Sequence, residues 1–207
     1  MGAAIAPCLA AIAAQNGLPH FSAIMPVEPG KGVIGMPQFH MDMADLSQIS
    51  ADTLLLVVVG QDDKLAREET AKEIFANATK VAPSNKNYVT LMSDNHGTPA
   101  LVADHFAPAA PGGGVAAAEP TRPEGNPSPM RERFAERFHK GPEEYASKMV
   151  NALDYYGTWK LLDALTDAAF YKRNREYALG DTPQQRFMGL WSDGVPVKEL
   201  RVDPLGR

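Results

Sequence analysis

The sequence predicts an α/β fold in which crossover helices connect three parallel strands, with further helices towards the carboxyl end. One observation behind this prediction is the run TLLLVVV at Thr53–Val59, which Gly60 closes. Such a continuous apolar run is typical of a strand buried on both faces of a parallel sheet. A second observation is that strand and helix patterns alternate with short connections in the first half of the chain. This order joins parallel strands, and 207 residues are enough to bury a core.

The first elements are a helix and a strand. The alanine-rich stretch Gly2–Gln15 predicts a buried helix, which Asn16 and Gly17 end. Phe21–Val27 is a short apolar run that predicts the first strand of the sheet. It is closed by a Glu-Pro-Gly turn at residues 28–30.

The crossover between the second and third strands is the next element. Lys64–Lys80 predicts an amphipathic helix. Its apolar side consists of Leu65, Ala71, Ile74, Phe75 and Ala78. Tyr88–Met92 predicts the third strand, entered through a polar segment.

The second half of the chain has a different composition. We expect an α/β part over residues 1–106, a Pro/Gly/Ala-rich loop or linker over 107–129, and a helical extension with an irregular tail over 130–207. Arg131–His139 and Pro142–Tyr171 predict the helices of that extension. The apolar face expected to pack on the α/β part consists of Tyr145, Met149, Ala152, Leu153, Tyr156, Trp159 and Leu162.

Composition excludes several classes of function. The net charge of −5 gives no electrostatic footprint for nucleic acid. The apolar stretch at residues 1–14 is too short to span a bilayer and lacks the basic start of a secretory signal. The single cysteine, Cys8, excludes a disulfide framework and a cysteine-based zinc site. Both a cytoplasmic and, with an upstream signal lost, a secreted or periplasmic location are compatible with the sequence.

The candidate catalytic residues come directly after the predicted strands. In open α/β sheets, ligands bind outside the carboxyl ends of the strands. Asp62 and Asp63 follow the second strand, and His96 follows the third. A carboxylate that accepts a hydrogen bond from an imidazole orients it as a general base. We interpret His105, next to Asp104, as structural.

These residues resemble the α/β-hydrolase family over residues 1–108. The stretch LLLVVVGQDDKLA is similar to the turn that carries the acid of that family, with Asp63 preferred over Asp62. His96, followed by Gly97, resembles its histidine loop. Met1-Gly2 would be the last two positions of a G-x-S-x-G nucleophile elbow, so the backbone N–H of Met1 would serve the oxyanion hole. The serine itself would immediately precede Met1, and we expect a truncated hydrolase.

The resemblance implies a carboxylic ester hydrolase with a serine mechanism, inactive as it stands, acting on a small-molecule or lipid-like ester. It implies no metal and no organic cofactor. The group His40, Asp42 and Asp45 is interpreted as solvated surface rather than a metal site. Amide or carbon–carbon hydrolysis, and a non-catalytic fragment or interaction module, remain alternatives. In the family, Phe21–Val27 would pair with the strand before the nucleophile, so association through this edge is also expected.

Overall fold

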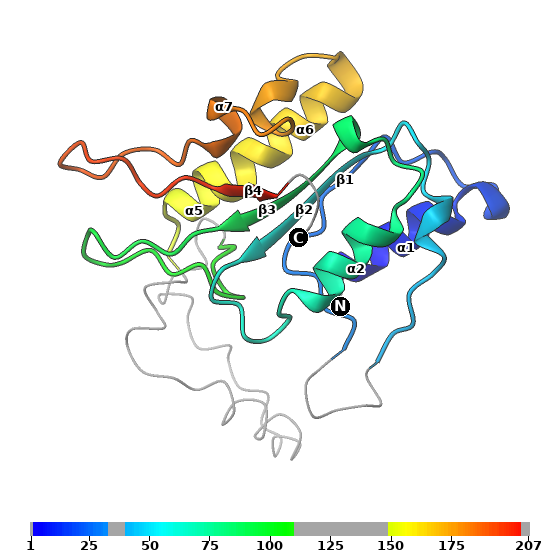
Figure 1. Ribbon diagram of the computed structural model, residues 1–207, viewed down its shortest axis with the longest axis horizontal. Coiled ribbons are helices and arrows are strands. Elements are labelled where there is room, and N and C mark those ends of the chain that lie inside the picture. The colour runs from blue at the N-terminus through cyan, green and yellow to red at the C-terminus, as the bar shows by residue number, and fades with distance from the viewer. Residues whose placement is uncertain (1, 33–39, 110–148, 204–207) are drawn as a thin grey trace, which may run out of the picture.

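A mixed four-stranded sheet organises the molecule. The structure is a computed structural model that describes residues 2–32, 40–109 and 149–203. The strands are β1 (Ala23–Ile24), β2 (Leu54–Gly60), β3 (Lys86–Leu91) and β4 (Arg201–Asp203), in the order β1-β2-β3-β4. β1, β2 and β3 run parallel, and β4 pairs antiparallel with β3 (Figure 1). The predicted α/β class and its three parallel strands are confirmed.

The central strand is β2, as its composition requires. All of its residues are buried, and it is hydrogen-bonded to β1 on one side and β3 on the other. Successive side chains of a strand point to opposite faces. Leu56 and Val58 therefore enter one hydrophobic cluster, whereas Leu55 and Val57 enter the other. The apolar side chains of β2 therefore contribute to the hydrophobic core on both faces of the sheet.

Helices cover both faces (Figure 1). Helices α1 (Gly2–Ile12) and α2 (Glu69–Asn77) lie on one side, and α5 (Ala152–Asp154) and α6 (Lys160–Tyr171) lie on the other. After α1, a single 3-10 turn leads to Gly17, whose positive φ of 64° ends the helical segment.

Helix α2 begins later than the sequence predicts. The predicted start was Lys64, but the side chain of Asp63 accepts hydrogen bonds from the N–H groups of Leu65 and Ala66. Arg67 then has a φ of 57°, in the left-handed region. These features form a turn after β2, and α2 starts only beyond it.

The apolar face predicted for the second long helix is partly wrong. Met149 and Leu162 are exposed, whereas Leu153 and Leu161 are buried. Met149 lies before Asn151, the N-cap of α5, and so outside the helix, although the predicted helix runs from Pro142 to Tyr171. For Leu162 the reason is a π-helical turn, Tyr155–Trp159, between α5 and α6. Its wider winding keeps residues four apart on the same side, which brings Leu161 rather than Leu162 towards the sheet.

Residues 149–203 share a core with the sheet. Leu153, Leu161 and Leu165 lie in one hydrophobic cluster with Leu56 and Val89. The segment expected to be an irregular tail also contains α7 (Pro183–Arg186) and β4, which were not predicted. The predicted helix 131–139 and most of the predicted linker lie outside the described residues.

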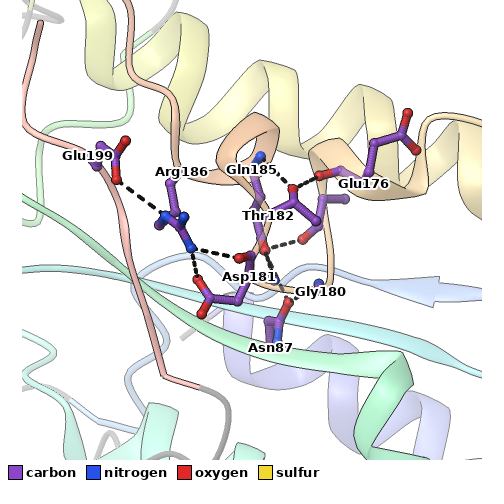
Figure 2. A network of polar contacts seen from close by, with 9 residues as sticks. Asn87, Glu176, Gly180, Asp181, Thr182, Gln185, Arg186 and Glu199 are labelled. Carbon is purple, nitrogen blue, oxygen red and sulfur yellow. Dashed lines mark hydrogen bonds and ion pairs between the residues drawn. The ribbon is translucent and has the colours of Figure 1, made fainter.

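A polar network fastens this carboxyl-terminal segment to β3 (Figure 2). The side-chain oxygen of Asn87 accepts hydrogen bonds from the N–H of Gly180, at 2.7 Å, and from Nε2 of Gln185, at 3.2 Å. The guanidinium of Arg186 bridges Asp181 and Glu199. Among the described residues, no helix is both long and apolar enough to cross a membrane.

Candidate active site

The segment that follows β3 folds back towards the turn that follows β2. Asp94 and Leu101 exchange two backbone hydrogen bonds, of 2.9 and 2.8 Å, which close the loop between them. The N–H of Asp62 then donates to the carbonyl of Ala103 at 2.9 Å. The segment after Leu101 therefore returns to the turn that follows β2, where it brings a second histidine beside Asp63.

That histidine is His105. Its Nδ1 lies 3.0 Å from Oδ2 of Asp63. The Asp63 side chain is 1% exposed and that of His105 is 34% exposed. Among the described residues, no hydrogen bond reaches Nε2 of His105. The pair therefore has the form of an oriented imidazole, held on one nitrogen and available on the other.

Asp63 is held as an anion. Burial by itself opposes its ionisation, but the hydrogen bonds from His105 and from the backbone N–H of Ala66, together with the nearby carboxyl of Glu28, outweigh burial and lower the pKa of Asp63. Its other oxygen, Oδ1, accepts from the N–H groups of Leu65 at 2.7 Å and Ala66 at 2.9 Å. The carboxylate is thus fixed in position by the turn that it caps.

The expectation that Asp63 orients His96 is wrong. Nε2 of His96 lies 2.8 Å from Oδ2 of Asp193, in an exposed pair. The buried side chain of Asp94 holds this region, since it accepts from the N–H of His96 and from Nε1 of Trp191. His105, interpreted from the sequence as structural, is the histidine that contacts Asp63.

A sequence signal for His105 existed. His96 stands in a polar Asp-Asn-His-Gly turn, a composition that places it on the surface. His105 instead lies among small apolar residues, and Leu101, Ala103 and Ala107 are all buried. The apolar residues at positions 101, 103 and 107 indicate a segment that packs on the core. A histidine in such a segment can contact a buried carboxylate.

Asp62 and Ser93 form a separate contact. Oγ of Ser93 donates to Oδ2 of Asp62 at 2.5 Å and accepts from the N–H of Ala103 at 2.9 Å. The structure therefore places Asp63, and not Asp62, against a histidine. Ser93 uses its hydroxyl to brace the loop rather than to face His105.

A buried glutamate completes the cluster. Ligating atoms of Glu28, Asp63 and His105 all lie within 4.8 Å of one another. Burial, followed by the proximity and negative charge of Asp63, raises the pKa of Glu28 to about 10. From its sequence context, Glu28 is predicted only as part of a turn.

Two other expected features lie apart from this cluster. His40 and Asp42 are exposed and 3.8 Å apart, while Asp45 accepts hydrogen bonds from Ser47 and Gln48. This geometry is that of a solvated surface. Met1, expected to supply an oxyanion N–H, lies outside the described residues.

Comparisons with protein-family models, with curated proteins and with solved structures give no match to this chain.

Proposed function

We propose that the protein is a carboxylic ester hydrolase in which His105 is the general base and Asp63 orients it. The observation that carries this proposal is the hydrogen bond between Nδ1 of His105 and the buried carboxylate of Asp63. The pair follows two adjacent parallel strands, the position where open α/β sheets bind ligands.

The proposed chemistry assigns one role to each nitrogen of the imidazole. Nε2 of His105 takes the proton of a nucleophilic hydroxyl as it attacks the ester carbonyl, and then returns it to the leaving alcohol. Asp63 accepts the Nδ1–H hydrogen bond throughout and stabilises the imidazolium while it exists. No described residue is assigned the role of nucleophile in this proposal.

Activity measurements on matched histidine variants test the proposal. The protein is produced as its gene encodes it, with any in-frame residues before Met1, and turnover of p-nitrophenyl acetate is measured. We expect His105→Ala and Asp63→Asn each to lower kcat by about 10⁴-fold or more, because the base or its orienting group is lost.

Matched controls lie a few residues away. His96→Ala and Asp62→Asn remove the same chemical groups from contacts with Asp193 and Ser93, and we expect each to change kcat by less than about threefold. Loss of turnover in His96→Ala together with full turnover in His105→Ala would refute the assignment.

A further inference from the structure

Glu28 is a buried acid whose oxygens lack ordinary partners. The residue is 5% exposed, and neither of its carboxyl oxygens makes a hydrogen bond of normal geometry with a described residue. A carboxylate in this position would be stripped of water with nothing to replace it. Either a positively charged group or a bound proton has to compensate for the lost hydration of the Glu28 carboxylate.

The charged groups near Glu28 are negative and therefore disfavour its ionised form. The charged groups that face Glu28 from the adjoining turn and loop are Asp63 and Asp104, and each favours the protonated form of Glu28. His105 belongs to the same cluster but is hydrogen-bonded to Asp63. Two ionised carboxyls at this separation in a buried site would repel each other.

The backbone of Glu28 is held against the end of β2. Its φ of 47° lies in the left-handed region, and its N–H donates to the carbonyl of Val58 at 2.9 Å. The side chain packs against Gly60, where a Cβ atom would lie 2.9 Å from Oε1 of Glu28. The fold thus fixes this carboxyl beside Asp63.

We propose that Glu28 is a positioning residue for the Asp63–His105 pair: it keeps a proton, directs that proton to Asp63, and leaves one negative charge on the two buried carboxyls. Asp63 is then the single anion available to hold the Nδ1–H of His105. Glu28 cannot compete for the imidazole, because its carboxyl is neutral and acts as a donor. The positioning role of Glu28 rests on the proposed function. The protonation state of Glu28 can be measured without any enzyme turnover.

A shared cation is the alternative compensation for Glu28. The side chains of Glu28, Asp63 and His105 are close enough to bind one metal ion together. However, both oxygens of Asp63 already accept hydrogen bonds, Oδ1 from two backbone N–H groups and Oδ2 from His105. A proton from solvent satisfies Glu28 without breaking any of these contacts, so the proton is favoured.

Carboxyl-carbon NMR titration of the full chain tests the proposal. The resonances of Glu28 and Asp63 are followed in the wild type, in Glu28→Gln, which keeps a donor, and in Glu28→Leu, which removes it. Glu69→Gln, an exposed acid on α2, is the matched control. Addition of Zn²⁺ to the wild type and to Glu28→Gln probes the cation alternative.

We expect Glu28 to remain protonated through neutral pH. Glu28→Gln should leave the pKa of Asp63 within a few tenths of a unit of the wild type. Glu28→Leu should raise the pKa of Asp63 by about one unit, since a hydrogen bond to the charged form is lost. Infrared spectra should show a protonated carboxylic acid band at neutral pH that disappears in Glu28→Gln.

Three results would overturn the proposal. A fall in the pKa of Asp63 in Glu28→Gln would mean that Glu28 is ionised in the wild type. Ordinary acidic titration of Glu28 would mean that it holds no proton at neutral pH. Stoichiometric Zn²⁺ binding abolished by Glu28→Gln would mean that a cation, not a proton, compensates the cluster. In each case activity of His105→Ala still decides the proposed function separately.

Discussion

The two histidines show how local contacts set a residue's role. His96 and His105 both follow β3 and both meet an aspartate, but they do so through different nitrogens. His96 uses Nε2 towards exposed Asp193, and His105 uses Nδ1 towards buried Asp63. Only the second arrangement leaves Nε2, the nitrogen that the proposed mechanism requires, without a hydrogen bond among the described residues.

Part of this site could be predicted from residues alone. Asp63 follows a strand that the sequence identifies without ambiguity, because seven consecutive buried residues in β2 need a continuous apolar run. For His105 the local pattern indicates only a segment that packs on the core, and it does not identify Asp63 as the partner. The position of His105 depends on the hydrogen bond from the N–H of Asp62 to the carbonyl of Ala103, a contact between distant parts of the sequence that no local pattern encodes.

At the scale of elements, the end of β2 and the loop after β3 are held in close contact. Gly60 makes this possible, since a Cβ atom there would overlap the backbone carbonyl of Ala103 as well as Oε1 of Glu28. A backbone atom cannot move aside as a flexible side-chain end can. The loop that carries His105 therefore depends on the absence of a side chain at Gly60.

We expect Gly60→Ala to destabilise the protein by about 1–3 kcal/mol, the usual cost of overpacking. It should also separate His105 from Asp63, because the two segments that carry them are pushed apart. Urea denaturation gives the first quantity, and turnover in the activity assay reports the second. Gly2→Ala is the matched control, since a Cβ atom at Gly2 meets nothing within 4 Å. Equal stability of the two variants would contradict the contact.

The helices show where sequence periodicity was insufficient. The pattern predicts both the crossover helix and the helix that ends at Tyr171, and both exist. It assigns part of the buried face wrongly, because a π-helical turn changes the winding between Leu153 and Leu161. Strand β4 has no apolar pattern of its own, since its three residues are exposed or half-buried and are defined by pairing with β3.

For the whole molecule, the buried carboxyl at Glu28 couples stability to pH. Its pKa is raised from 4.5 to about 10, so between these values the native state binds a proton that the unfolded state has released. Stability then falls as pH rises, by up to about 1.4 kcal/mol per pH unit for this group. Asp63 acts in the opposite sense, because its lowered pKa favours the native state above its usual value and this contribution is lost in acid.

We expect Glu28→Gln to remove the first of these dependences. Its free energy of unfolding should match the wild type at about pH 4 and exceed it increasingly towards pH 8. Urea denaturation at several pH values measures the difference, with Glu69→Gln as the exposed control. Parallel curves for Glu28→Gln and the wild type would show that Glu28 carries no proton in the native state at neutral pH.

The sheet ends at β1 within the described residues. The edge position of this strand follows from the order β1-β2-β3-β4. Its ordered part is shorter than the sequence predicts, since Ala23–Ile24 form the strand and Val27 adds a single bridge to Val58. Association of chains through this edge stays a prediction.

The tautomer of His105 tests the central claim most directly. Long-range ¹H–¹⁵N NMR of the full chain distinguishes a neutral imidazole protonated at Nδ1 from one protonated at Nε2. We expect His105 to carry its proton on Nδ1, donated to Asp63, and His96 to carry its proton on Nε2, donated to Asp193. In Asp63→Asn the His105 preference should weaken while His96 is unchanged. A His105 protonated at Nε2, or one insensitive to Asp63→Asn, would contradict the assignment of Asp63 and His105 as the acid–base pair.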